Sequence, residues 1–196
     1  ATHLLFNNES IYLLKDNKLN LVEKNNLIPK FDFSLSEPTL TITDIDFWNG
    51  SLYVLDNQNQ LIWKLSPNSN GFSTPQKWLK NDTKLEIGAN SLAIDGQVWV
   101  LNHSGQIDLY TSGIKDKFSQ KKTINFTKAV SLVTDPESDF LVFNDNSEFI
   151  YVYRKNGEYY SKYNLSKYKI IDLAFDSNNN TIYFLSSDQK IYQINL

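Results

Sequence analysis

Neither cysteine nor methionine occurs among the 196 residues of this sequence. Without cysteine, the chain can form no disulfide, thiolate metal site or thiol nucleophile. Because the first residue is Ala1 and not methionine, we expect the chain to be processed or cut from a longer protein.

Long apolar runs and basic clusters are missing as well. No segment approaches the roughly 18 apolar residues that span a bilayer, so we expect no transmembrane segment in this chain. The net charge is -3 and the pI is about 5.4, with acids and lysines interspersed along the sequence. Such a charge distribution argues against a nucleic-acid partner, since phosphate binding needs a basic patch. The composition, 41% hydrophobic, is typical of a soluble chain with one core.

A repeated unit organises what is present. The segment DIDFWNGSLYVLDNQNQLIWKL, residues 44–65, reads as strand, turn, strand, turn, strand. Matching units occupy residues 3–22, 91–110, 131–153 and 172–194, at intervals of about 42 residues. The second strand of each unit is almost continuously apolar, as at Leu52–Leu55 and Phe140–Phe143, which is typical of a strand buried on both faces. We therefore predict an all-β fold, a five-bladed β-propeller of four-stranded antiparallel blades.

The repeat also predicts the boundaries of the blades within a single domain, 1–196. We expect blades at approximately 1–36, 39–81, 86–127, 129–166 and 169–196. Candidate fourth strands lie at 30–33, 76–79, 123–126 and 159–163. The fifth unit ends after its third strand, so the last blade is either incomplete or completed by a strand upstream of Ala1.

One set of polar residues shares a position at the start of the inner strands, where a propeller has the mouth of its central channel. These residues are His3, Asp44, Ser91, Ser131 and Asp172. They could bind a ligand, either a cation or a hydroxylated molecule. The sequence favours another interpretation, in which they satisfy backbone groups of the neighbouring blade or bind channel water. Two Asp, two Ser and one His are not the ligand set of a transition metal, so we predict no metal and no cofactor.

Three further positions carry candidate chemistry. Asp44 and Asp46 form an i, i+2 carboxylate pair that could act as general acid and base. His103 lies in a turn, where a solvated role is expected. Trp48 stands where the other units have Asn or Asp, so it is a possible surface contact.

The segments SLAIDGQVWVLNHSGQIDLY and IIDLAFDSNNNTIYFLSSDQKIYQINL resemble the repeats of NHL and YWTD propellers. The run KWLKNDTKLEIGANSLAIDGQVWVLNHSGQI is similar to C-terminal extracytoplasmic propellers of bacterial membrane proteins, some of which also carry a phosphatase-like cytoplasmic domain. This resemblance implies a sensor or scaffold module of a larger bacterial protein, at an extracytoplasmic or cell-surface location. The metal-ligand sets of lactonase-like propellers have no counterpart here.

These observations predict a non-catalytic module, not an enzyme, that binds a protein or an extracellular ligand. One alternative is a carbohydrate-binding, lectin-like propeller with a site in each blade. Another is a hydrolase that uses Asp44 and Asp172 at the channel mouth. Fold alone cannot separate these alternatives.

Overall fold

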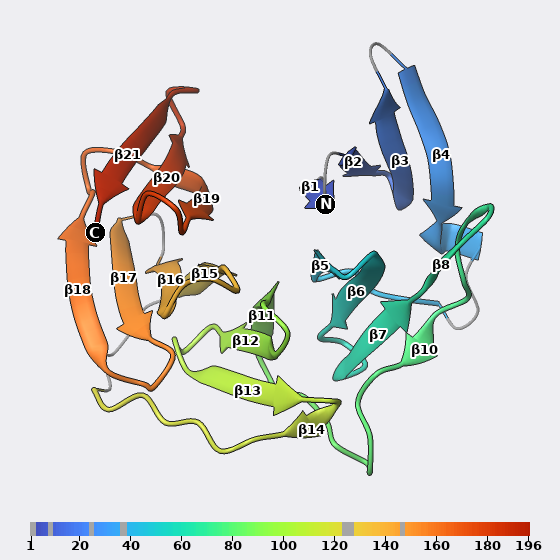
Figure 1. Cartoon of the computed structure of the whole chain (residues 1–196), viewed down its shortest axis with the longest axis horizontal. Coiled ribbons are helices and arrows are strands. Elements are labelled where there is room, and N and C mark those ends of the chain that lie inside the picture. The colour runs from blue at the N-terminus through green and yellow to red at the C-terminus, as the bar shows by residue number, and fades with distance from the viewer. Residues whose placement is uncertain (1–2, 8–9, 24–25, 36–38, 123–127, 146–147) are drawn as a thin grey trace. The chain divides into compact units, whose positions relative to one another are not determined.

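Five antiparallel sheets, the blades, follow one another along the chain, and four of them are built from consecutive strands (Figure 1). The structure, a computed structural model, describes residues 3–7, 10–23, 26–35, 39–122, 128–145 and 148–196. These residues form strands and one short 3-10 turn, η1 (Phe33–Leu35), and no α-helix. The all-β class and the five sheets of a five-bladed β-propeller are thus confirmed. No helix among them has the length and apolar character needed to cross a membrane.

Contacts divide the chain into two compact units, residues 1–85 and 86–196. The first unit holds two four-stranded sheets and a short ribbon. Its first sheet contains β1 (His3–Asn7), β2 (Ser10–Lys15), β3 (Lys18–Glu23) and β4 (Asn26–Asp32). Its second sheet contains β5 (Asp44–Trp48), β6 (Ser51–Asp56), β7 (Leu61–Leu65) and β10 (Gln76–Lys77), while β8 (Pro67–Asn68) pairs with β9 (Gly71–Phe72) in the ribbon.

The second unit holds three sheets. The third sheet of the chain contains β11 (Ala89–Ile94), β12 (Val98–Asn102), β13 (Ile107–Thr111) and β14 (Ile114–Lys115). The fourth contains β15 (Ala129–Thr134), β16 (Phe140–Asp145), β17 (Phe149–Arg154) and β18 (Tyr159–Asn164). The fifth contains β19 (Ile170–Asp176), β20 (Thr181–Ser186) and β21 (Ile191–Asn195), three strands within the part of the chain that the structure describes.

The strand register agrees with the predicted repeat in four sheets. The first predicted inner-strand residue pairs with the last residue of the predicted second-strand segment in each of them: His3 with Leu14, Asp44 with Leu55, Ser91 with Leu101, Asp172 with Leu185. The hairpin between β5 and β6 turns at Asn49-Gly50, where both residues have positive φ, 51° and 76°. Asn-Gly is the sequence that such a tight turn favours.

The fourth sheet corrects the prediction by one residue. Leu132 pairs with Phe143, and Thr134 pairs with Leu141, so Phe140 lies beyond the expected segment. The equivalent of Leu52–Leu55 is therefore 141–144 and not 140–143. The turn after β15 is longer than its counterparts and closes with a hydrogen bond from Ser138 N–H to the Asp135 carbonyl (3.1 Å). The strand thus ends on the buried polar residues Asn144 and Asp145.

The fourth strands agree only in part. β18 lies where it was predicted, and β4 and β10 overlap their predicted segments. The segment predicted at 123–126 lies outside the described residues. The described outer strand of the third sheet is β14, only two residues long, which was not predicted.

The cores lie between successive sheets within each unit. In residues 1–85, Leu14 and Leu19 of the first sheet pack with Phe47, Leu52 and Val54 of the second. In residues 86–196, one apolar cluster joins the third and fourth sheets, and another joins the fourth and fifth. Because side chains alternate across a strand, β16 contributes Leu141 and Phe143 to one cluster and Val142 to the other.

Candidate functional site

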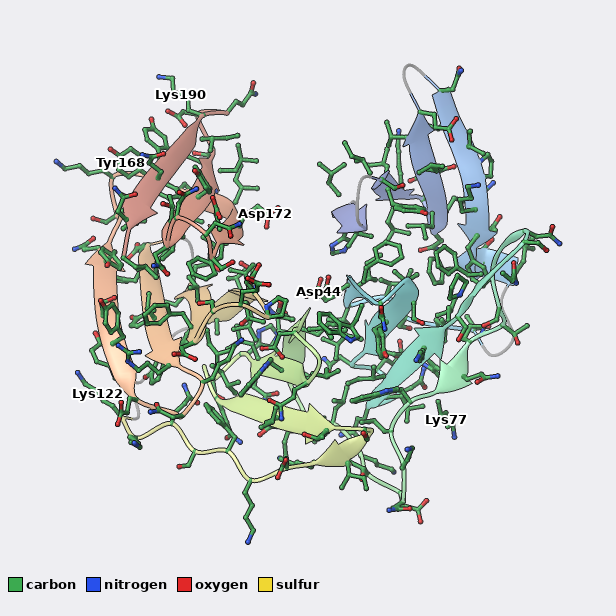
Figure 2. All side chains as sticks on the ribbon, in the orientation of Figure 1. Asp44, Lys77, Lys122, Tyr168, Asp172 and Lys190 are labelled. Carbon is green, nitrogen blue, oxygen red and sulfur yellow. The ribbon has the colours of Figure 1, made fainter. Side chains whose placement is uncertain are left out.

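The predicted inner-strand residues are engaged within the chain, as far as the described contacts show. In the first unit, His3 Nδ1 lies 3.8 Å from Asp44 Oδ1. In the second unit, Ser91 Oγ accepts a hydrogen bond from the backbone N–H of Leu132 in the next sheet (3.1 Å). Figure 2 labels Asp44 on β5 and Asp172 on β19.

The other members of the set make local hydrogen bonds. Ser131 Oγ donates to Asn144 Oδ1 (2.7 Å), within the fourth sheet. Asp172 Oδ1 accepts from the N–H of Leu173 (2.9 Å). Ser91 therefore satisfies a backbone group of the neighbouring blade, one of the roles that the sequence favoured. Ligand binding by the set stays a prediction.

The carboxylate pair of β5 is also bonded to the backbone. Asp44 Oδ1 accepts from the N–H of Ile45 (2.9 Å), and Asp46 Oδ1 accepts from the N–H of Phe47 (2.7 Å). Each side chain thus folds back on the residue that follows it. This arrangement supplies hydrogen-bond acceptors for the backbone of the strand.

Trp48 is the last residue of β5, and His103 lies in the turn after β12. Trp48 is half-buried at the end of β5, opposite Ser51. His103 is exposed, while its backbone bonds to both Gly88 and Ala129. The surface role of Trp48 stays a prediction.

Buried polar residues at the ends of second strands were not singled out by the sequence analysis. Asp56, Asn102 and Asp145 end β6, β12 and β16 and are 0%, 4% and 6% exposed. Each bonds a side chain of the third strand of its own sheet. The bonds run from Trp63 Nε1 to Asp56 Oδ2 (3.1 Å), from Asn102 Nδ2 to Asp108 Oδ2 (3.4 Å) and from Tyr151 Oη to Asp145 Oδ2 (2.9 Å). All three residues lie just before the second turn of their repeat unit, and this shared position was the signal in the sequence that could have identified them.

Asp145 has an altered acidity. Burial raises the pKa of its carboxyl, and the hydrogen bond from Tyr151 opposes that shift. Burial also raises the pKa of the Tyr151 hydroxyl, and the bond to Asp145 adds to the effect because the hydroxyl must stay protonated to donate.

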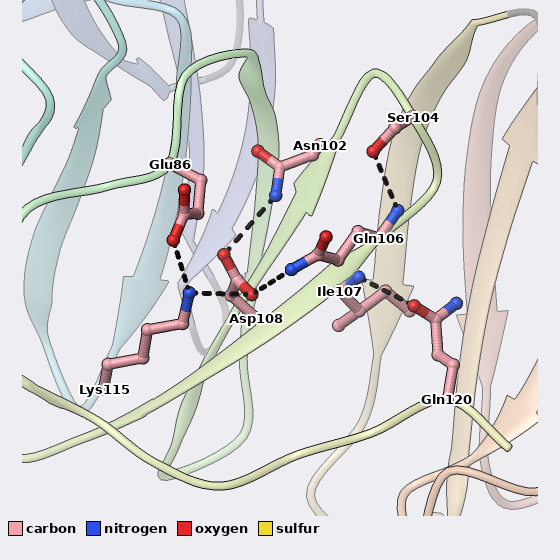
Figure 3. Close-up of polar contacts among 8 residues, drawn as sticks. All are labelled: Glu86, Asn102, Ser104, Gln106, Ile107, Asp108, Lys115 and Gln120. Atoms are coloured by element: carbon pink, nitrogen blue, oxygen red, sulfur yellow. Dashed lines mark hydrogen bonds and ion pairs between the residues drawn. The ribbon is translucent and has the colours of Figure 1, made fainter. Parts of the chain in front are cut away.

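Asp108 lies at the centre of a polar network in the second unit (Figure 3). Lys115 Nζ lies 3.2 Å from Asp108 Oδ1 and 2.9 Å from Glu86 Oε1. Gln106 Nε2 also donates to Asp108 Oδ1 (3.0 Å). Burial lowers the pKa of Lys115, but its bonds to the two carboxylates outweigh burial and raise it overall. The lysine therefore stays charged, neutralises the buried aspartate and attaches β14 to the sheet.

A second ion pair, partly exposed, connects the third and fourth sheets. Asp95 Oδ2 lies 2.6 Å from Lys155 Nζ and accepts a hydrogen bond from Trp99 Nε1 (3.0 Å). Lys155 Nζ also donates to the Asp135 carbonyl (2.8 Å). Asp95 is thus bonded on two sides by groups of this chain, which gives it a structural role.

Aromatic rings and cations gather at the outer side of the fourth sheet. The Arg154 guanidinium lies 5.2 Å from the ring centre of Phe140 and 5.3 Å from that of Tyr160. Lys162 Nζ lies 3.5 Å above the Phe149 ring, and Lys122 Nζ lies 4.0 Å above the Tyr159 ring. Figure 2 places Lys122 beside β18. We name Lys122, Arg154, Tyr159, Tyr160 and Lys162 the outer aromatic surface.

The cations of the outer aromatic surface form no close ion pair within the described residues, although the carboxylates of Asp145 and Glu158 lie within electrostatic range of Lys162 and Arg154. Among the described residues, Lys122, Arg154 and Lys162 have no carboxylate within ion-pair distance, 4.0 Å. Tyr160 is 44% exposed. An exposed aromatic ring beside unpaired cations is the composition of a contact surface for proteins.

Comparison of the sequence with protein-family models and with curated proteins gives no match. Solved structures are similar in fold. A propeller in the nidogen/laminin complex aligns with all of this chain and 74% of its own, at 16% identity and a TM-score of 0.65. A gluconolactonase from Xanthomonas campestris aligns over 96% of this chain and 69% of its own, at 9% identity and a TM-score of 0.69. The computationally designed Ika8 protein aligns over 98% of this chain, at 13% identity and a TM-score of 0.64, and the chain spans 57% of its length. At these identities the similarity shows the β-propeller fold alone.

Proposed function

We propose that this chain is a non-catalytic β-propeller module that binds a partner protein. The observation that carries the proposal is the outer aromatic surface, where Tyr160 is exposed and Arg154 and Lys162 form no ion pair within 4.0 Å among the described residues. Arginine and tyrosine are enriched among the residues that dominate binding energy in protein interfaces. Ring and guanidinium are already held against each other, so less side-chain freedom is lost on binding.

The environment of the buried acids supports binding over acid–base chemistry. Asp56, Asp95, Asp108 and Asp145 accept hydrogen bonds from groups of their own unit. A catalytic carboxylate has to reach a substrate from a cleft, whereas these four connect strands and sheets. These four carboxylates are therefore engaged in hydrogen bonds that stabilise the fold.

Two further considerations support a partner-binding role. One of the similar structures, from the nidogen/laminin complex, is part of a protein complex. The resemblance of residues 77–107 to extracytoplasmic propellers supports an extracytoplasmic or cell-surface location, which belongs to this proposal.

The test is a selection of displayed protein fragments against the immobilised chain. We expect binders whose affinity falls at least tenfold, about 1.4 kcal/mol, on the double variant Arg154→Ala/Tyr160→Ala. Lys77→Ala, an exposed residue of β10, is the matched control and should leave affinity unchanged. Trp48→Ala tests the other candidate contact. A selection that yields no specific binder, or binders indifferent to the double variant, would overturn the proposal.

A hydrolase is the second candidate function, supported by the structural similarity to a gluconolactonase. Its residues would be Asp44 and Asp172. Lactone hydrolysis should then exceed the buffer rate and fall on Asp44→Asn or Asp172→Asn. Under the binding proposal, the chain gives no acceleration with or without added divalent cations.

A further inference from the structure

We propose that β18 receives an extended acidic segment of the partner protein as an additional strand of the fourth sheet. This inference rests on the proposed function and specifies how the partner is bound. It follows from the backbone of β18, from the charges around it and from the way the outer strands of the first three sheets are protected.

The backbone of β18 offers a long edge. The strand has six residues and pairs only with β17 within the described part of the chain. An edge strand presents unpaired N–H and C=O groups along one side, which can pair with another chain. Six residues are enough for a ladder of several hydrogen bonds, the usual basis of peptide recognition by strand addition.

The outer strands of the first three sheets are protected against such pairing. β10 and β14 have only two residues each. β4 is longer, but it contains Pro29, which lacks a backbone donor. β21 of the fifth sheet, five residues without proline, also has one edge unpaired within the described residues, but it carries no charged side chain. β18 contains no proline and is not shortened in this way. Its length is therefore consistent with a binding role.

The charges around β18 select the chemistry of the partner. Lys162 lies opposite Tyr151 in the ladder and Tyr159 lies opposite Tyr153, so both face the same side of the sheet, with Lys122 above the Tyr159 ring. Arg154 lies with Tyr160 on the other side. An added strand would thus meet a cation on each side of the sheet. Carboxylates on the added strand would find partners on both sides, whereas a basic strand would be repelled.

A second copy of this chain is a poorer occupant of the same edge. Two β18 strands side by side would bring the Lys162 and Arg154 side chains of one copy near those of the other. Like charges across a strand pair destabilise it. The acidic segment of a partner has the complementary charge.

The direct test uses a labelled peptide and the intact chain. The probe is an acetylated ten-residue peptide of alternating glutamate and threonine, with binding followed by fluorescence anisotropy. We expect saturable binding that weakens as salt is raised, and no binding of the same peptide with lysine in place of glutamate. Lys162→Glu should weaken binding roughly three- to tenfold, in the range expected for exposed ion pairs. Lys77→Glu changes the net charge equally on the two-residue outer strand β10 and should have no effect.

Backbone methylation of the peptide separates strand addition from simple charge attraction. An added strand needs backbone N–H groups that point toward β18, so methylation of every peptide N–H should abolish binding, whereas simple charge attraction should survive it. Undiminished binding of the fully methylated peptide would overturn strand addition. Absence of any binding by the acidic probe would also overturn it.

The outcome also separates this inference from the proposed function. If the displayed fragments bind through Tyr160 and Arg154 but the acidic peptide does not bind, the module binds proteins by a different mode. Concentration-dependent self-association of the free chain that protects the β18 amides from hydrogen exchange would assign the edge to a second copy and would overturn the inference as stated.

Discussion

Trp99 connects the third and fourth sheets, and its truncation to alanine is the most informative stability test. The side chain is 1% exposed and belongs to the apolar cluster that also contains Leu141 and Phe143. Its ring lies edge-on to Phe118, with centres 5.1 Å apart and planes at 83°. Its indole N–H donates to Asp95 Oδ2 (3.0 Å).

The expected cost of Trp99→Ala follows from these contacts. Removal of a buried aromatic side chain costs roughly 3–5 kcal/mol, because apolar contact is lost and a cavity remains. The lost hydrogen bond adds about 1 kcal/mol, since Asp95 keeps its bond to Lys155. We expect a total near the upper end of that range. Trp99→Phe retains a ring in the cluster and should cost about 1–2 kcal/mol.

Urea denaturation followed by circular dichroism measures the effect without relying on the fluorescence of the substituted tryptophan. Trp48→Ala, at a half-buried position, is the control and should cost less than half as much as Trp99→Ala. If Trp99→Ala costs under about 1 kcal/mol, the packing argument and the repeat register behind it are wrong.

Three other predictions concern single contacts in the second unit. Ser91→Ala leaves the buried N–H of Leu132 without its acceptor and should lower the free energy of unfolding by about 1–3 kcal/mol in urea titrations. Gly157→Ala should lower the melting temperature by several degrees, because φ is +86° and an added Cβ would lie 2.0 Å from the Ser119 carbonyl oxygen; an unchanged melting temperature would refute this. For Asp145, the folded-state pKa is raised above 3.8, so the ionised form destabilises the fold. As the pH rises from about 4 through the raised pKa, the wild type should lose stability relative to Asp145→Asn, and parallel stability curves would contradict the assignment.

The repeat register could be predicted because it depends on local patterns. Alternating apolar residues and tight polar turns, such as Asn49-Gly50, repeat in each unit and determine which residues pair. The pattern failed by one position in the fourth sheet, since Phe140 resembles the start of a buried strand and Asn144 resembles a turn residue. Burial of Asn144 within β16 depends on its bond to Ser131, which no periodicity indicates.

The contacts that join elements were harder to predict. The pairs Asp95–Lys155 and Asp108–Lys115 involve residues that lie 60 and 7 positions apart, and neither pair has a counterpart that the repeat would reveal. The outer aromatic surface was missed for a related reason. Its members come from two strands and a loop, so only the folded sheet brings them together.

The nearly consecutive strand order of the sheets has a consequence for how the protein acquires its structure. Except for β7 and β10, which enclose the β8–β9 ribbon, strands that pair are neighbours in sequence, so each hairpin closes a short loop at small entropic cost, and a sheet is complete once about 40 residues have been made. During synthesis, residues 1–85 therefore emerge with all the partners of their own unit before the second unit is finished. We expect pulsed hydrogen exchange during refolding to protect the amides of each sheet as a group, with protection between sheets following later.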